Sequence, residues 1–204
     1  MILKNLLGIK SEIELAKEEE KLSKLKAKKL FESGFFDGLN VGSFASLAAI
    51  HQELFGDIYD FAGKLRAVNI SKGNFRFAPI TYLEDAIKKI EKMPQSNFDE
   101  IVEKYVEMNI AHPFREGNGR SMRIWLDLML KKELKKVIDW NRIDRDDYLM
   151  AMERSPIKDT EIKLLLNGAL SDEINSADVF MKGIDASYYY EGYTLFKTEE
   201  LGER

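Results

Sequence analysis

The sequence has 204 residues, no cysteine and a formal net charge of −4. A chain of this length, with 45% hydrophobic residues, can fill one core and is short for two. The lack of cysteine excludes disulfides and thiolate metal sites and fits a reducing, cytoplasmic location. Basic and acidic residues are interspersed, which argues against direct nucleic-acid binding, and the amino-terminal segment lacks the apolar run of a secretion signal or membrane anchor.

The first third of the chain predicts two helices. The first begins at Ser11, whose spacing to Glu14 forms a capping box, and closes at Gly34. We interpret its run 18–20, three glutamates, as a solvated face. The second helix begins at residues 42–43 and carries His51 beside its apolar positions, where a core or edge histidine is expected.

Residues 65–78 interrupt the helical pattern. Two short, partly alternating runs, 65–70 and 74–78, flank a turn and predict a β-hairpin. One interpretation is a plain connecting hairpin. The other is a flap whose edge receives an extended segment of a target protein by strand addition, formed by Ile70, Ser71, Lys72 and Gly73.

The rest of the chain again predicts helices. Capping boxes at Thr81 and Asn97 open two of them, which end at Met93 and Ala111. The helix that begins around residues 118–120 is apolar nearly all round, so we expect it to be buried. Further helical segments are expected at 148–153, 159–170 and 177–181, which makes the fold all-α with one hairpin.

The stretch from His112 to Arg123 has the composition of an active site. Glycines 117 and 119 can turn backbone N–H groups toward one point at the start of a helix, which forms an anion-binding nest suited to phosphate. Arg120 and Arg123 lie one turn apart and match phosphate oxygens, and Glu116 offers a carboxylate for nucleotide-bound Mg²⁺. His112 is the natural general base. Each feature alone is typical of a turn or a solvated face, but their combination is not.

Residues 112–123 resemble the signature HxFx(D/E)GNGRxxR of Fic-domain proteins, which are mostly AMP transferases, and every fixed position is matched. The resemblance implies the Fic fold for a single domain, 1–204, with a core at about 41–155. It also favours the flap, since Fic proteins carry one before the core helices. The roles that it implies are a base at His112, Mg²⁺ binding by Glu116 and nucleotide binding by Gly117, Asn118, Gly119, Arg120 and Arg123.

A second motif lies in the tail. Residues 187–192 match the pattern (S/T)xxxE(G/N) of the autoinhibitory helix found in many Fic proteins, which we place at about 185–192 with Asp185 as its N-cap. Ser187 and Glu191 are four residues apart and share a helical face. Glu191 can then pair with Arg123 and occupy the space that the γ-phosphate of ATP needs.

The resemblance implies transfer of AMP from ATP·Mg²⁺ to a Ser, Thr or Tyr hydroxyl of another protein. Two alternatives stay open: transfer of another phosphate-linked group or a kinase reaction, and a nucleotide-sensing module without chemistry. Gly119 argues for AMP, because the kinase-like branch has lysine there. The target, the signal that releases inhibition and assembly into a homo-oligomer are not determined by the sequence.

The tail also contains a cluster of tyrosines around Glu191. Tyr188 adjoins Ser187 at what we expect to be the start of the inhibitory turn, where local unfolding needs little free energy. A tethered tail meets the active site at high effective concentration. We therefore expect automodification at Tyr188, with Tyr193 next.

Overall fold

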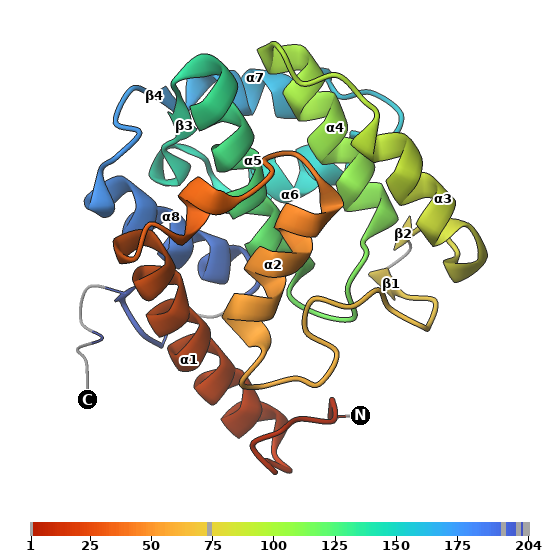
Figure 1. Ribbon diagram of the computed structural model, residues 1–204, viewed down its shortest axis with the longest axis vertical. Helices are drawn as coiled ribbons and strands as arrows, with labels where there is room; N and C mark the ends of the chain where they lie inside the picture. Colours follow the sequence, from red (N-terminus) through yellow and green to blue (C-terminus); the bar gives the residue numbers. More distant parts are fainter. Residues whose placement is uncertain (1, 73–74, 193–194, 199–200, 202–204) are drawn as a thin grey trace.

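The computed structural model describes residues 2–72, 75–192, 195–198 and 201, which form a mainly helical fold. Helix α5 (Asn118–Leu134) lies at its centre, with α2 (Phe44–Phe55), α4 (Phe98–Ala111) and α8 (Ala177–Tyr190) packed against it (Figure 1). Helix α1 (Glu12–Glu32) contacts both α2 and α8. The predicted fold class, a helical bundle with a small hairpin, is confirmed.

The remaining elements connect and cover this core. They are the short helices η1 (Phe35–Gly38) and η2 (Trp140–Arg142), the helices α3 (Ile80–Glu91), α6 (Arg145–Arg154) and α7 (Thr160–Gly168), and the strands β1 (Ser71–Lys72), β2 (Phe75–Arg76), β3 (Val137–Ile138) and β4 (Leu170–Ser171).

Helix α5 is buried as its apolar composition predicts. Met122, Trp125, Leu126 and Met129 are all fully buried. The indole N–H of Trp125 donates to the Ser43 carbonyl at 3.1 Å and the Ser46 hydroxyl at 3.2 Å, which ties α5 to the start of α2. A site mounted on the first turn of α5 is therefore held by the core of the protein.

Three of the helices begin at the predicted caps. The side chains of Ser11, Ser43 and Asn97 each accept a backbone N–H three residues on, at 3.4, 3.1 and 3.0 Å. The predicted cap at Thr81 is wrong, because α3 begins at Ile80, and it ends at Glu91. The first N–H of that helix donates instead to the side chain of Asn69, at 2.9 Å, a partner that local spacing does not reveal.

The hairpin is shorter than predicted. Its antiparallel pairs are Ser71 with Arg76 and Lys72 with Phe75, and residues 65–70 are not a strand. A second antiparallel pair, β3 with β4, was not predicted. The helices α6 and α7 lie between its two strands in the sequence, so no short turn motif joins them and local patterns do not predict the pairing.

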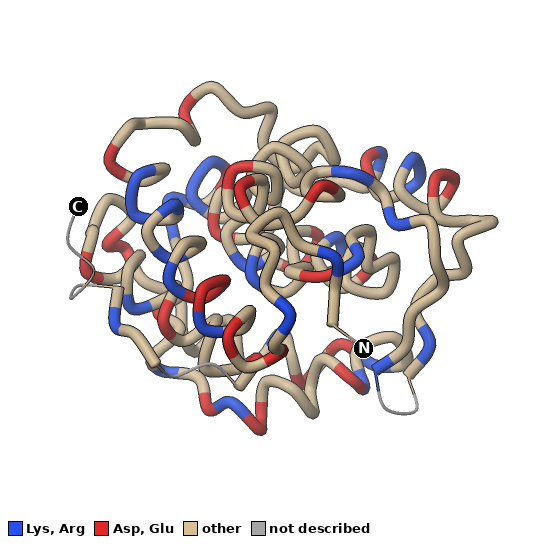
Figure 2. The backbone as a smooth tube through the Cα atoms, turned by 90° about the horizontal axis from the view of Figure 1, so that it is seen from below, with Lys and Arg blue, Asp and Glu red and all other residues tan. Residues whose placement is uncertain are grey.

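Charged residues of both signs are interspersed along the backbone (Figure 2). None of the helices in the described residues has the length and the apolar character needed to cross a bilayer.

Candidate active site

His112 ends α4 in a left-handed conformation, with φ 48° and ψ 64°. A residue with a side chain adopts this conformation at a free-energy cost of about 1–3 kcal/mol, unless its surroundings hold it there. The buried Arg66 does so by donating from Nε to the His112 carbonyl at 2.8 Å and from Nη2 to the Ala111 carbonyl at 3.1 Å. Arg66, which the sequence did not single out, therefore fixes the loop entrance.

The ring of His112 has a defined orientation. Its Nδ1 lies 3.2 Å from the Asn109 carbonyl, which requires a proton on Nδ1 and leaves Nε2 as the acceptor. The Phe77 ring, next to the hairpin, stacks on it with centroids 3.6 Å apart. Burial lowers the pKa of His112 to about 4, although the bond to Asn109 acts in the opposite sense. At neutral pH the imidazole is uncharged and can accept a proton.

The loop after His112 is closed by the side chain of Asn118. Its Oδ1 accepts from the Phe114 N–H and its Nδ2 donates to the Phe114 carbonyl, both at 2.8 Å. Gly117 precedes the helix with φ 76°, and a Cβ there would lie 2.6 Å from Cε2 of Phe55, so only glycine fits. The Asn118 amide is thus committed to the shape of the loop, which holds backbone N–H groups at the start of α5.

His51 also supports this loop through hydrogen bonds. Its Nδ1 accepts from the Gly63 N–H at 2.9 Å, so Nε2 carries the proton and donates to the Glu116 carbonyl at 2.7 Å. Its ring is stacked on Phe114 with centroids 3.8 Å apart. Burial lowers the pKa of His51 to about 4. The expected core histidine is therefore a brace for the motif loop.

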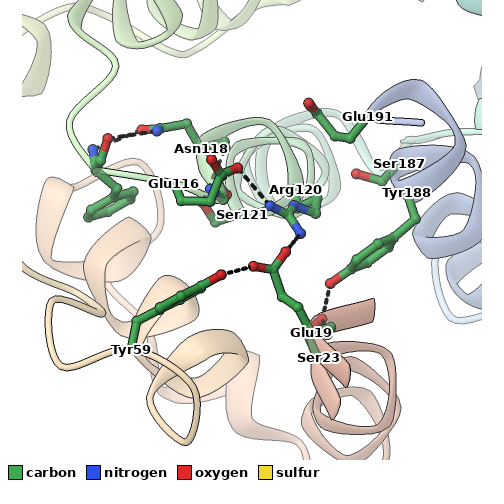
Figure 3. A network of polar contacts seen from close by, with 12 residues as sticks. Glu19, Ser23, Tyr59, Glu116, Asn118, Arg120, Ser121, Ser187, Tyr188 and Glu191 are labelled. Atoms are coloured by element: carbon green, nitrogen blue, oxygen red, sulfur yellow. Dashed lines mark hydrogen bonds and ion pairs between the residues drawn. The ribbon is translucent and has the colours of Figure 1, made fainter. Parts of the chain in front are cut away.

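Figure 3 shows a polar network around Arg120, which includes the expected metal ligand, Glu116. Nη2 of Arg120 lies 2.9 Å from Oε1 of Glu116, and Nη1 contacts the carboxylate of Glu19 from α1. Tyr59 donates its hydroxyl to the same Glu19 carboxylate. The side chains of Arg120 and Glu19 are each 2% exposed, whereas that of Glu116 is 41% exposed. Two carboxylates thus neutralise Arg120, and Arg120 in turn orients Glu116.

The prediction that residues 18–20 form a solvated face is wrong. Glu19 and Glu20 are both buried, and Glu20 pairs with Lys24 at 3.0 Å and accepts the N–H groups of Leu195 and Phe196. Apart from Lys24, which lies one turn further along α1, the partners of these charges are far away in sequence: Tyr59 and Arg120 contact Glu19, and the tail contacts Glu20.

The tail places Ser187 and Glu191 next to Arg123. Nη1 of Arg123 donates to the Ser187 hydroxyl at 2.6 Å, and Nη2 lies 3.5 Å from Oε1 of Glu191. The other oxygen of Glu191 lies 3.4 Å from Nζ of Lys72 in the hairpin. Burial alone would raise the pKa of Glu191, but the charges of Arg123 and Lys72 lower it, so the carboxylate is ionised.

Gly119 lies next to the Glu191 carboxylate. A Cβ at position 119 would come within 2.6 Å of Oε1 of Glu191. The glycine of the motif therefore leaves the space that Glu191 occupies.

Two expectations about the tail require correction. Asp185 is not an N-cap, because α8 begins at Ala177 with Ser176 as its cap. Asp185 lies inside the helix and pairs with Lys24 at 2.9 Å. Tyr188 is likewise within the helix, 2% exposed, with its hydroxyl against that of Ser23, so the premise that it starts an easily unfolded turn is wrong.

Other expected residues lie at the edge of the site. Ser71 and Lys72 are exposed in the hairpin, and Ile70 is half-buried before it. Gly73 and Tyr193 lie outside the described residues. Phe77 connects the hairpin to His112, because its ring packs on both Phe75 and His112.

Residues 43–130 match the model of the Fic/DOC family, and the chain carries a Fic domain. It is 34% identical to protein adenylyltransferase VbhT of Bartonella schoenbuchensis, over 74% of this chain and 33% of that protein. It is 27% identical to a probable protein adenylyltransferase Fic of Salmonella typhimurium, over 84% of this chain and 88% of that protein. The chain thus spans only a third of the length of the first of these relatives.

Solved structures share the fold. BepC of Bartonella tribocorum with bound AMPPNP has a TM-score of 0.68 at 18% identity, covering 84% of this chain and 93% of that chain. The Fic domain of a Bep effector from Bartonella quintana with bound ADP has a TM-score of 0.66 at 21% identity, covering 83% and 90%. The predicted Fic fold is therefore confirmed, and the two relatives found by sequence are named as a protein adenylyltransferase and a probable protein adenylyltransferase, a class of nucleotidyltransferase.

Proposed function

We propose that this protein is an adenylyltransferase that transfers AMP from ATP to a Ser, Thr or Tyr hydroxyl of a target protein. The observation that carries the proposal is a neutral His112, its Nδ1 turned to Asn109, beside a glycine loop at the first turn of α5. A base next to an anion-binding helix start is what in-line attack on a phosphorus atom requires. The names of the relatives support the same reaction.

The chemistry assigned to His112 is a single proton transfer. The target oxygen attacks the α-phosphorus, the bond from that phosphorus to the bridging oxygen breaks, and pyrophosphate leaves. Nε2 of His112 takes the hydroxyl proton. The negative charge of a bound nucleotide would raise the pKa of His112 from its value of about 4, which makes it a stronger base when ATP is present.

The phosphates would be held by the loop and by Arg123. The N–H groups at the start of α5 stabilise negative charge without further movement of the protein. Arg123 suits the outer phosphate once Glu191 has left it. Arg120 is engaged by Glu19 and Glu116, so its main contribution is to orient Glu116.

Glu116 fits Mg²⁺, which commonly binds proteins through one or two carboxylates and takes its other ligands from substrate phosphates and water. Its side chain is 41% exposed at the mouth of the site. When bound, Mg²⁺ would neutralise charge on the phosphates.

The proposal includes self-inhibition by the tail. Glu191 lies within ion-pair distance of Arg123, where a γ-phosphate would compete for the same guanidinium. Removal of Glu191 should therefore free Arg123 for ATP. The hairpin contributes through Lys72, which contacts the second oxygen of Glu191.

Target docking is assigned to the hairpin. Its two-residue strands carry exposed residues at positions 71, 72 and 76, and such an edge suits strand addition by an extended target segment. Phe77 links this segment to the ring of His112.

Automodification of the tail belongs to the same proposal. Tyr188 can be modified only after α8 leaves α1, because its hydroxyl is buried against Ser23, whereas Tyr189 is 53% exposed. Peptide mass spectrometry after incubation with ATP·Mg²⁺ tests this. If Tyr188 acquires AMP in the parent protein as fast as in a variant whose tail is released from α1, then α8 does not have to leave α1 before Tyr188 is modified.

The decisive test uses ATP labelled either at the α- or at the γ-phosphate. The Glu191→Gly variant, incubated with each ATP and a cell lysate, should label protein only from the α-position. Label from the γ-position would identify a kinase reaction, and a lack of label with intact ATP binding would identify a nucleotide-sensing module.

A further inference from the structure

A cavity of about 290 Å³ lies between part of the central helix α5 and α8. One wall is a single face of α5, with the spacing of successive helical turns: Arg120, Arg123, Ile124, Asp127, Leu128 and Lys131. The opposite wall is Ser176, the N-cap of α8, and a single face of that helix with the same spacing: Val179, Phe180, Gly183, Ile184 and Ser187. The two helices thus face one another across unfilled space, and the direct polar contacts of α8 with α5 lie at the end of α8 that carries Ser187 and Glu191.

The size of the cavity limits its ligand to a small molecule. An apolar cavity of about 150 Å³ accommodates benzene. The α5–α8 cavity therefore has room for a phenyl ring with a short alkyl chain. Aliphatic side chains from both helices, including Ile124 and Val179, provide apolar contacts for such a body.

Three phenylalanines form one side of the cavity. Phe180 of α8 stacks on Phe31 at the end of α1, with centroids 4.7 Å apart, and lies 5.9 Å from Phe36 in η1. All three line the cavity and are only half-buried. Such rings favour an aromatic body and attract organic cations to their faces.

The charges of the lining favour a cation. Three carboxylates line the cavity, those of Asp37, Asp127 and Glu173. Of the three basic residues there, Arg120 and Arg123 are ion-paired with glutamates of the active site, and Lys131 is the third. The lining thus has an excess of negative charge that the active-site arginines do not neutralise.

Asp127 is the most informative of these carboxylates. It accepts the Ile138 N–H at 2.8 Å and the Trp140 indole N–H at 3.0 Å. Within the described residues, its polar partners are these two N–H groups, and no lysine or arginine forms a salt bridge with it. Burial raises the pKa of Asp127 to about 7, in spite of those two hydrogen bonds. A cation in the cavity would lower that pKa and would thereby gain binding free energy.

We propose that the α5–α8 cavity is a binding site for a small aromatic amine, whose ammonium group lies near Asp127 and whose ring packs among Phe31, Phe36 and Phe180. Because the ligand contacts α5 and α8 together, it stabilises α8 on α5. The binding site itself is argued from the cavity and its lining and does not depend on the proposed function. Its consequence for turnover, a lower rate when the amine is bound, rests on the proposed function.

Phenethylamine is a suitable probe, and phenylethanol and phenylpropionate are its neutral and acidic counterparts. Titrations followed by calorimetry or ligand-detected NMR are run without ATP, so that their result is independent of the transferase reaction. The amine should bind in a saturable manner, about tenfold more tightly than either counterpart, as one ion pair of moderate strength gives. Equal binding of the three compounds would overturn the assignment of an amine.

Three variants locate the site. Val179→Phe fills the cavity and should abolish binding, whereas Leu164→Phe, at an exposed position of α7, should leave it unchanged. Asp127→Asn keeps an acceptor oxygen but loses the charge, so the amine should bind no better than the alcohol. Circular dichroism checks that each variant is folded. Undiminished binding to a folded Val179→Phe protein would overturn the site.

Hydrogen exchange tests the effect on α8. Amide exchange of residues 177–190 should slow severalfold when phenethylamine is bound, because opening of α8 would release the ligand. Exchange in α7 serves as the internal control. Saturable binding with unchanged exchange in α8 would show that the site exists and does not hold the helix.

Discussion

Oε1 of Glu191 lies 3.5 Å from Nη2 of Arg123, so the glutamate of the tail motif at 187–192 contacts the last arginine of the motif at 112–123. The second oxygen of Glu191 lies 3.4 Å from Lys72 of the hairpin. One carboxylate therefore joins the tail, the start of α5 and the hairpin, and its removal should affect all three.

Glu191→Gly is expected to raise AMP transfer by about 10- to 100-fold, which corresponds to the loss of roughly 1.4–2.8 kcal/mol of inhibitory contact. Glu191→Gln, which keeps the size and loses the charge, should raise it nearly as much. The measurement is the initial rate with labelled ATP, together with ATP affinity. A rate no higher than that of the parent in both variants would contradict inhibition by Glu191.

Lys72→Ala should have a much smaller effect. The Lys72 side chain is 67% exposed, and exposed ion pairs contribute about 0–1 kcal/mol, so activation should stay below about fivefold. Raised salt should reduce the difference between variant and parent. Lys88→Ala, at an exposed position of α3, is the control. Activation as large as that of Glu191→Gly would show that the hairpin, not Arg123, holds the carboxylate.

His112→Ala should reduce transfer by about 10²- to 10⁴-fold, the range typical of general-base removal, with ATP·Mg²⁺ binding retained. Since the pKa of His112 in the free protein is about 4, kcat/KM should not fall because of this group until the pH approaches that value. Rates within a few-fold of the parent would rule out His112 as the base.

Glu19→Gln should lower the free energy of unfolding by roughly 3–5 kcal/mol, because it leaves the buried Arg120 with one fewer charged partner. Tyr59→Phe, which removes one hydrogen bond to Glu19, should cost about 1 kcal/mol. Urea unfolding gives both values, with Glu18→Gln as the neighbouring control. Equal stability of the Glu18 and Glu19 variants would contradict the buried ion pair.

Acid should destabilise the protein through His51. Its pKa is about 4 in the folded state against 6.5 as the ordinary value, so the unfolded state binds more protons between those limits. Neutral His51 contributes its full stabilising free energy, about 3 kcal/mol, above pH 6.5. This contribution falls as the pH drops below 6.5 and is lost by about pH 4. His51→Gln should flatten this part of the curve of stability against pH, and NMR titration of His51 should show no midpoint near 6.5. A slope that is unchanged in the variant would assign the effect to another group.

The sequence by itself determined the features that depend on neighbouring residues. The end of α4 at Ala111 follows from Pro113, the start of α5 follows from the glycines around Asn118, and the caps at Ser11, Ser43 and Asn97 each act within one turn. The active-site motif is contiguous, so its residues could be named without knowledge of the fold.

Tertiary structure decided which charges are buried and what they contact. Glu19 meets Arg120, and Lys72 meets Glu191, across long stretches of chain. A run of glutamates next to lysines has the same local pattern whether it faces water or a buried guanidinium. The free energy of a buried charge depends on its partner, and only packing of α1, α5, α8 and the hairpin brings that partner within reach.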